Sequence, residues 1–386
     1  MSKINIKNLS NENNDGAPNI VGISTFSSTA YFVPPKGDTT QRPQNPEPGS
    51  LRFNTDTASL EYFRGDTLGW TQIEMTSSDL DGGSTRGFAA GGHSGPNGSG
   101  YSNTIEYYGI DYPNNALDFG DLVTNRGNGV GGCASRTRGF VTGGYNQGKQ
   151  IEYFTVSSTG NASNFDTIGD WSEGAVGMGN QIRGFNLGGF IRPAPNAWTR
   201  PSTIDCWDTS SLGSRFDFGD LLYDLNYGSA FASQTRGIYA GGTHPEIINT
   251  IQYVTLSTSG NAQDFGDLTK EAYVPSGCSN STRGITFIGM SPDTSTNTNT
   301  IDYTTIATKG NAVEFGEHIS SCSTAQAAAS PTRASVYGGT GGGILGWFVV
   351  NIATQGNSVE FGDTVGAGSN YGKYGGGGLS NGHGGL

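Results

Sequence analysis

The sequence has little positive charge and no long apolar run. Of its 386 residues, 21 are Lys or Arg and 33 are Asp or Glu, which gives a formal net charge of −12. Such a surface repels phosphate backbones, so we expect no nucleic-acid partner. No run of roughly 18 apolar residues is present, and Met1 to Lys7 lack an apolar core. The sequence therefore predicts neither a membrane span nor a secretory signal.

Cysteine and histidine are scarce, with four of each. Their positions form neither Cys-x-x-Cys pairs nor the spacing of metal ligands, so we expect no metal and no cofactor. No phosphate loop is present, and no Gly-x-Ser-x-Gly elbow joins a predicted strand to a helix. The sequence therefore predicts no catalytic residues and no enzyme activity.

Glycine, by contrast, is abundant, and many of the 63 glycines belong to a repeat. The clearest copy, Thr137 to Gly144, has Arg-Gly directly after its first residue and ends with Gly-Gly. The arginines that begin the copies lie 52, 45, 53, 47 and 50 residues apart by subtraction, and they are Arg86, Arg138, Arg183, Arg236, Arg283 and Arg333. A residue present in every copy is expected to be structural, so we expect each arginine to join adjacent strands or repeats through an acid or a backbone carbonyl.

Two further motifs follow most of these arginines. An apolar-polar-aromatic triplet such as Ile151-Glu152-Tyr153 comes first, and Phe-Gly-Asp, as in Phe119 to Asp121, comes next. Each repeat then contains four short strand patterns separated by turn residues. A small four-stranded sheet cannot bury both faces alone, whereas a ring of such sheets can. We therefore predict an all-β fold in which residues 76–386 form a six-bladed β-propeller with four-stranded blades.

The first repeat lacks one strand pattern, and the end of the chain supplies it. In the other repeats the residue five positions before the arginine is always apolar, as Cys133, Met178, Phe231, Cys278 and Ala328 show. Before Arg86 this position holds an acid, while Leu379 lies in a matching Gly-rich stretch. We therefore predict that residues 374–381 join the sheet of Arg86 and close the ring. The six apolar residues should then occupy equivalent innermost positions near the axis.

Residues 1–47 and 48–75 differ from the repeats. The first segment is polar and rich in proline, with an apolar patch at Ile20 to Val33. One interpretation is an extended arm that needs a partner surface, and the other is a disordered tail. For the arm we expect partner contacts through Ile20, Phe26, Tyr31 and Phe32. Residues 48–75 contain three strand patterns, which predicts a small β-meander.

Loops of unequal length follow the Gly-Gly pairs. Between Gly92 and Ile105 there are 12 residues, and between Gly189 and Ile204 there are 14. In a propeller these loops leave the same face, where aromatic loop tips suit the binding of glycans or proteins. We expect partner contacts from Ile191, Arg192, Trp198 and Tyr101. Tolerated insertions without a function are the alternative.

Several motifs resemble those of phage proteins. The segment Gly49 to Asp56, followed by Leu60-Glu61-Tyr62 and Trp70, is similar to a short module common in phage tail and fibre proteins. Ser24 to Phe26 and Tyr31 to Pro35 look like the amino-terminal arms of virion proteins from T4-like phages of marine cyanobacteria. The repeats resemble the Gly-Gly/Ile-Glu-Tyr repeats of such proteins and, more distantly, kelch repeats, which carry a Trp where this chain has Phe-Gly-Asp.

The resemblance implies a non-enzymatic bacteriophage virion protein, assembled in the host cytoplasm and located in the virion. It implies a tail-fibre or appendage component for host attachment, in which the arm binds other virion proteins and the chain forms a homo-oligomer. The loops would bind a receptor, either a glycan or a protein of the host surface. A capsid, neck or tail decoration protein with a purely structural role is the alternative. The two differ in whether the loop face is exposed on the particle.

Overall fold

The computed structural model describes residues 34–56, 59–67, 69–72, 85–94, 100–145, 149–168, 172–194, 197–211, 213–292, 296–340, 344–365 and 373–386. The expected all-β fold class is confirmed, since the described residues form sheets of largely antiparallel strands and one short 3-10 helix, η1 (Thr39–Gln41). Within those ranges no helix is long and apolar enough to cross a membrane. The chain divides into two compact units, Met1–Thr76 and Ser77–Leu386.

The smaller unit contains one sheet in the order β1-β2-β3-β4. Its strands are β1 (Lys36–Gly37), β2 (Leu51–Asn54), β3 (Ser59–Phe63) and β4 (Trp70–Gln72). The last three strands form an antiparallel meander, and β1 adds parallel to β2. Arg42 also reaches this sheet, where its Nη2 lies 2.6 Å from Oε2 of the buried Glu61. Lys36 and Gly37 thus pair with the small sheet and Arg42 contacts it, whereas the sequence analysis assigned these residues to an extended arm over residues 1–47.

In the larger unit, four sheets share one strand order. Sheet 3 contains β13 (Val176–Gly179), β14 (Arg183–Leu187), β17 (Thr203–Asp208) and β18 (Phe216–Asp220), and sheet 4 contains β19 (Ser229–Ala232), β20 (Arg236–Ala240), β23 (Thr250–Thr255) and β24 (Gln263–Asp267). Sheet 5 contains β25 (Ser276–Ser279), β26 (Arg283–Phe287), β29 (Thr300–Thr305) and β30 (Val313–Glu317), and sheet 6 contains β31 (Gln326–Ala329), β32 (Arg333–Tyr337), β33 (Gly346–Asn351) and β34 (Val359–Asp363).

Sheets 1 and 2 are joined by one long strand, β8 (Leu117–Ala134). Sheet 1 contains β35 (Gly377–Ser380), β5 (Arg86–Ala90), β7 (Gly100–Gly109) and the first part of β8, and sheet 2 contains the second part of β8, β9 (Arg138–Tyr145), β10 (Gln150–Thr155) and β11 (Ser163–Thr167). The sequence predicted two separate strands here. The backbone stays paired because Arg126 lies opposite Ser102 of β7 and its buried side chain donates to the carbonyl of Gly143 in β9.

The expected pairing of the carboxy-terminal strand is confirmed. Leu379 of β35 lies opposite Phe88 of β5, in the register that Cys133 has with Phe140. The other apolar residues of this set likewise pair with the residue two after their arginine, and all six are buried. They border the central cavity described below, and Met178 and Phe231 also pack on Gly237 and Gly284 of the following sheet.

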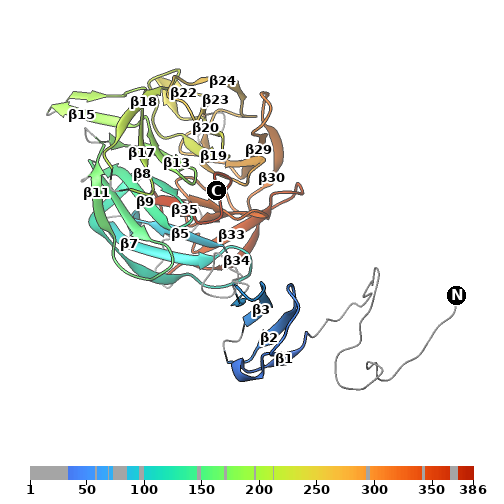
Figure 1. Cartoon of the computed structure of the whole chain (residues 1–386). Helices are drawn as coiled ribbons and strands as arrows, with labels where there is room; N and C mark the ends of the chain where they lie inside the picture. Colours follow the sequence, from blue (N-terminus) through green and yellow to red (C-terminus); the bar gives the residue numbers. More distant parts are fainter. Residues whose placement is uncertain are drawn as a thin grey trace. The chain divides into compact units, whose positions relative to one another are not determined.

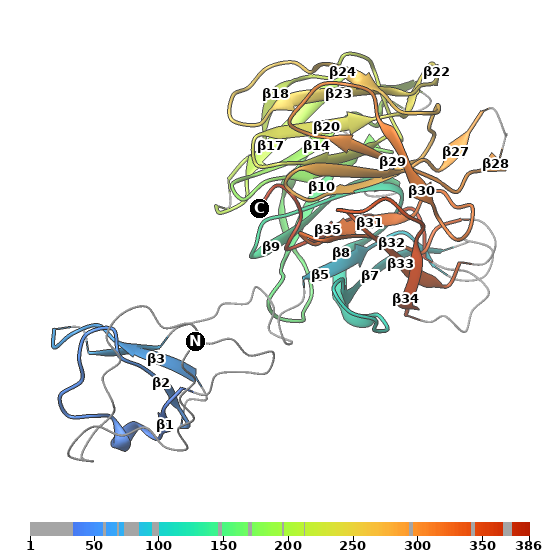
Figure 2. The same cartoon turned by 90° about the vertical axis from the view of Figure 1, so that its right-hand side faces the viewer.

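The six inner strands contact one another in a closed order. β8 contacts β13, followed by β19, β25, β31 and β35, and β35 contacts β8 again. The outer strands β11, β18, β24, β30 and β34 lie at the periphery of this unit (Figure 1). A view turned by 90° shows successive sheets stacked side by side (Figure 2). The apolar core lies between neighbouring sheets, so each sheet depends on both of its neighbours for burial.

Candidate functional site

Six backbone groups form a closed cycle of hydrogen bonds at one end of the inner strands. Each N–H donates to the carbonyl of the equivalent residue in the neighbouring sheet, at 2.7 to 3.3 Å. Each residue in the following order donates to the next one, and the last donates to the first: Gly129, Gly375, Thr324, Val274, Tyr227 and Gly174. All six residues have positive φ, between 48° and 76°. Left-handed backbone costs about 1–2 kcal/mol at a residue other than glycine, so the cycle holds Tyr227, Val274 and Thr324 against a local preference.

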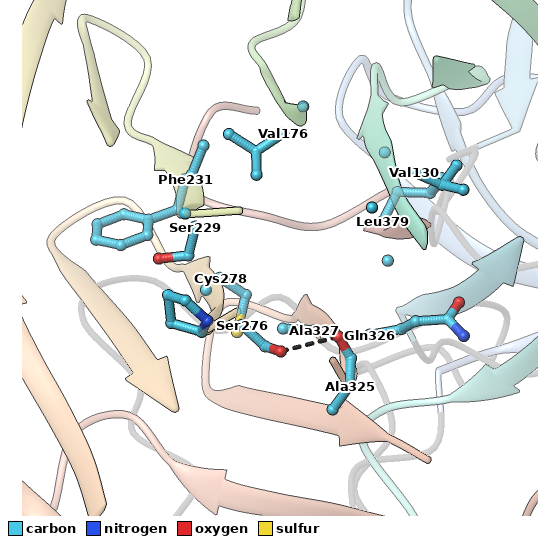
Figure 3. A pocket seen from close by; sticks show the side chains of 18 of the residues that line it. Val130, Val176, Ser229, Phe231, Ser276, Cys278, Ala325, Gln326, Ala327 and Leu379 are labelled. Carbon is cyan, nitrogen blue, oxygen red and sulfur yellow. Dashed lines mark hydrogen bonds between the residues drawn. The ribbon is translucent and has the colours of Figure 1, made fainter. Parts of the chain in front are cut away.

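Inside this hydrogen-bond cycle lies an axial cavity of about 380 Å³. All six inner strands contribute to its wall, and none of the described residues that line it is Asp, Glu, Lys or Arg. Figure 3 shows residues of several sheets around the cavity, with Ser276 donating across to the carbonyl of Ala325 at 2.8 Å. The wall is therefore uncharged but contains polar groups.

The residues of one end of the cavity, the mouth, are aromatic and polar. Tyr227 and Tyr273 are partly exposed there, with their rings in edge-to-face contact at 5.6 Å. The Tyr227 hydroxyl donates to Glu173 at 2.7 Å. Burial raises the pKa of Glu173, and the hydrogen bonds from Tyr227 and Asn128 oppose that shift. Asn128 Oδ1 also accepts a hydrogen bond from His93 Nε2 at 2.6 Å, so a polar chain runs along the mouth.

Residues 381–386 cross the opposite end of the cavity. Gly384 N–H donates to the carbonyl of Ser279, and Gln181 N–H donates to that of Gly385. His383 donates through Nε2 to the carbonyl of Ala134 at 2.7 Å and accepts at Nδ1 from Gly385 N–H at 3.1 Å. Burial lowers the pKa of His383 to about 4, although the hydrogen bond donated to Ala134 opposes that shift. The hydrogen bond accepted at Nδ1 requires the neutral ring. This segment therefore connects sheets 2, 3 and 5 beneath the cavity.

The repeat arginines join neighbouring sheets around the whole unit. Each Nη1 donates to a backbone carbonyl of the following sheet, and the pairs are Arg86–Val156, Arg138–Thr209, Arg183–Leu256, Arg236–Ile306, Arg283–Ile352 and Arg333–Asp111. Most of the guanidinium groups also lie over an aromatic ring of their own sheet, such as Arg138 over Tyr153 at 5.2 Å. The contact is thus of the arginine-to-carbonyl kind, and it joins each sheet to the next.

Phe-Gly-Asp has a similar role. Phe119 and Asp121 accept from the N–H groups of Gly160 and Ala162 in sheet 2, while Asn161 Oδ1 accepts from Asp121 N–H at 3.0 Å. Equivalent contacts join sheets 3 to 4, 4 to 5, 5 to 6 and 6 to 1. At the junction of sheets 2 and 3, where the motif is distorted, Asp166 instead accepts from Arg215 N–H.

The residues predicted to contact partners lie in different parts of the chain, and not all of them are among the described residues. Ile20, Phe26, Tyr31 and Phe32 lie outside the described residues. Ile191 and Arg192 belong to β15 (Phe190–Ala194), and Trp198 belongs to β16 (Ala197–Thr199). Ile191 is partly exposed and pairs with Ser172 of β12 (Ser172–Glu173), beside the mouth. Tyr101 of β7 packs on His93 and Tyr145, with ring centroids 4.9 and 5.3 Å away.

Several segments expected to be loops are short β-hairpins. β15 pairs with β16, β21 (Thr243–His244) with β22 (Glu246–Ile247), and β27 (Met290–Ser291) with β28 (Thr296–Asn297). In the first repeat, β6 (His93–Ser94) pairs with β7. The segments continue strand pairing beyond the Gly-Gly turns, because both of their ends emerge from neighbouring antiparallel strands.

Catalytic and metal chemistry has little support among the described side chains. No three His, Cys, Asp or Glu residues there are arranged to hold a metal ion. All four cysteines are free and buried, and burial raises the pKa of each thiol to about 12, so they remain protonated.

Sequence reasoning did not find the hydrogen-bond cycle or the cavity mouth. The six cycle residues lie four positions before the apolar inner residues, yet three are glycine and the others are Tyr, Val and Thr. Their shared feature is a backbone conformation, and only the three glycines carry a sequence signal for it. His383 occurs once and has no repeat equivalent that could mark it.

Neither a comparison with models of known protein families nor a search of curated proteins finds a match.

Proposed function

We propose that the larger unit is a six-bladed β-propeller closed by β35. Three sets of contacts support this proposal, because each runs from sheet to sheet and returns from sheet 6 to sheet 1. These are the hydrogen-bond cycle, the arginine-to-carbonyl bonds and the Phe-Gly-Asp contacts, the last of which differs at one junction. Such redundancy favours a rigid support for surface hairpins.

We further propose that the protein is a non-enzymatic virion component of a bacteriophage, in which residues 1–47 attach the chain to other virion proteins and the propeller is displayed. The motif resemblance of residues 24–70 suggests the phage setting. The observation that carries a binding role is the aromatic mouth, which adjoins the three-stranded sheet β12-β15-β16 and opens into a cavity with an uncharged wall. A host surface glycan or protein is the proposed receptor, and the chain is proposed to act as a homo-oligomer in the particle.

The test is the location of the protein in intact particles. Antibodies raised against the β15–β16 hairpin should label intact virions, and the same label should be lost when residues 1–47 are deleted from the phage gene. In the purified deletion variant the larger unit should keep its melting temperature, because the described residues of the deleted segment contact the small sheet of the other unit. This measurement separates failed attachment from failed folding of the larger unit. Normal incorporation of the deletion variant would refute the attachment role.

The same labelling separates the alternative function. A capsid, neck or tail decoration protein with a purely structural role would be present in the particle but would bury the hairpin face against its neighbours. Antibody binding only after particle disruption would support that alternative and exclude a receptor-binding role.

A further inference from the structure

The axial cavity has a wall that presents both hydrogen-bond donors and acceptors. β13, β19, β25, β31 and β35 are each the terminal strand of their sheet. Alternate residues of such an edge strand point N–H and C=O away from the paired strand. These edges border the cavity, together with hydroxyl-bearing residues of several sheets, Ser229, Ser276, Thr324 and Thr340.

The cavity is also closed by the protein at one end. His383 lines it there and is fixed by hydrogen bonds at both ring nitrogens. Gly384 and Gly385 lie against the backbone of Asn280 and Gly179, where any side chain would collide. A ligand would therefore enter past Tyr227 and Tyr273, at the mouth.

The chemistry of the wall selects among ligand classes. An anion would lack a partner, because no Lys or Arg lines the cavity and the chain carries a net charge of −12. A small cation would find no carboxylate among the lining residues, and Glu173 at the mouth already accepts a hydrogen bond from Tyr227. An apolar ligand would leave unsatisfied those strand-edge groups that have no partner in a neighbouring sheet. A neutral ligand that carries several hydroxyl groups satisfies donors and acceptors alike, and tyrosine offers an apolar ring face with a polar edge.

We propose that this cavity binds a single uncharged, polyhydroxylated ring of monosaccharide size, with Tyr227 and Tyr273 at its entrance. The volume of about 380 Å³ falls at the small end of ligand pockets, which span roughly 300–1,000 Å³. The inference deepens the proposed receptor-binding role by naming a ligand class. Its test uses purified protein, so its outcome does not depend on whether the protein is part of a virion.

The experiment measures sugar binding by the purified full-length chain. The probes are the methyl glycosides of glucose, galactose, mannose and N-acetylglucosamine, studied by saturation-transfer NMR and titration calorimetry. Ala230→Leu places a larger side chain at a cavity-lining position, and Tyr273→Leu removes an entrance ring. Val359→Leu, at an exposed position of outer strand β34, is the matched control.

At least one probe should bind, and both cavity variants should weaken that probe by about tenfold or more while the control binds normally. If Ala230→Leu does not fold, Tyr273→Leu alone decides, because its side chain is partly exposed. Absence of binding by all four probes would overturn the proposal and would indicate a cavity filled by water. Binding that is unchanged in the folded cavity variants would also overturn it, since the sugar would then occupy another surface.

Discussion

Leu379 lies opposite Phe88 in the β35–β5 pair, and both side chains are buried in one apolar cluster. The two residues are 291 positions apart by subtraction, so their contact joins the end of the repeat region to its beginning. The same sheet junction contains Gly375 in the hydrogen-bond cycle and Lys373, whose Nζ donates to the carbonyl of Thr104 at 2.8 Å. Closure of the larger unit thus depends on residues 373–380.

Removal of every residue after Asp363 should destabilise the larger unit severely. The truncation deletes the partner strand of β5, two bonds of the hydrogen-bond cycle and the segment beneath the cavity. Thermal unfolding followed by circular dichroism should show a much lower melting temperature. Leu379→Ala, a milder change at the same contact, should cost about 2–5 kcal/mol in urea unfolding. Equal melting temperatures for the truncated and full chains would contradict the role of β35.

Gly378→Ala should be strongly destabilising although it adds one methyl group. A Cβ atom at Gly378 would lie 2.3 Å from the carbonyl oxygen of Ala327 on the neighbouring inner strand. Relief requires movement of backbone, so we expect a loss of about 1–3 kcal/mol in unfolding free energy. Gly356→Ala is the control, because a Cβ atom there meets nothing within 4 Å. Equal stability of the two variants would show that the inner strands are less closely packed than described.

His383 should contribute stability that disappears in acid. Its folded pKa of about 4 lies below the unfolded value of about 6.5, so the contribution is complete above pH 6.5 and is lost as the pH falls towards 4. The difference corresponds to roughly 3 kcal/mol at most. The measurement is the unfolding free energy of the wild type and of His383→Gln in urea at several pH values between 4 and 8. The difference between the two proteins removes the effect of the other titrating groups. The stability gap between them should narrow as the pH falls through this window, and a constant gap would contradict the assignment.

The parts of the fold that could be predicted are those that recur. The arginines, most of the Phe-Gly-Asp motifs and the apolar residue five positions before five of the arginines make the same contacts at successive junctions, so their spacing reveals the repeat. Leu379 could be assigned because its stretch matches the inner strand around Cys133. In physical terms, periodic contacts impose periodic residue types.

The cavity could not be predicted, because its features are not periodic in residue type. Tyr227, Val274 and Thr324 adopt the same left-handed backbone as three glycines, and tertiary hydrogen bonds rather than local preference hold them there. The hairpins beyond the Gly-Gly turns also lack a shared pattern. Their composition suggested loops, but continuation of strand pairing decided their structure.

The buried pair of Arg126 and Glu152 provides a final prediction, because the chain contains an uncharged version of it. Arg126 and Glu152 are fully buried, and Glu152 also accepts from Val123 N–H. Two sheets later, the equivalent positions hold Leu225 and Gln252, and Gln252 accepts from Leu222 N–H at 2.7 Å.

Arg126→Leu alone leaves a buried carboxylate without its cation and should cost about 3–5 kcal/mol in unfolding free energy. Glu152→Gln alone leaves the buried guanidinium of Arg126 without its carboxylate. Burial already lowers the pKa of Arg126, so this variant should cost a similar amount. The double variant recreates the Leu225–Gln252 arrangement, so it should recover most of the lost stability, as measured by urea unfolding of all four proteins in a double-mutant cycle. Additive losses in the double variant would show that the two side chains act independently. That result would mean that the charge is needed at this junction for a reason other than their mutual neutralisation.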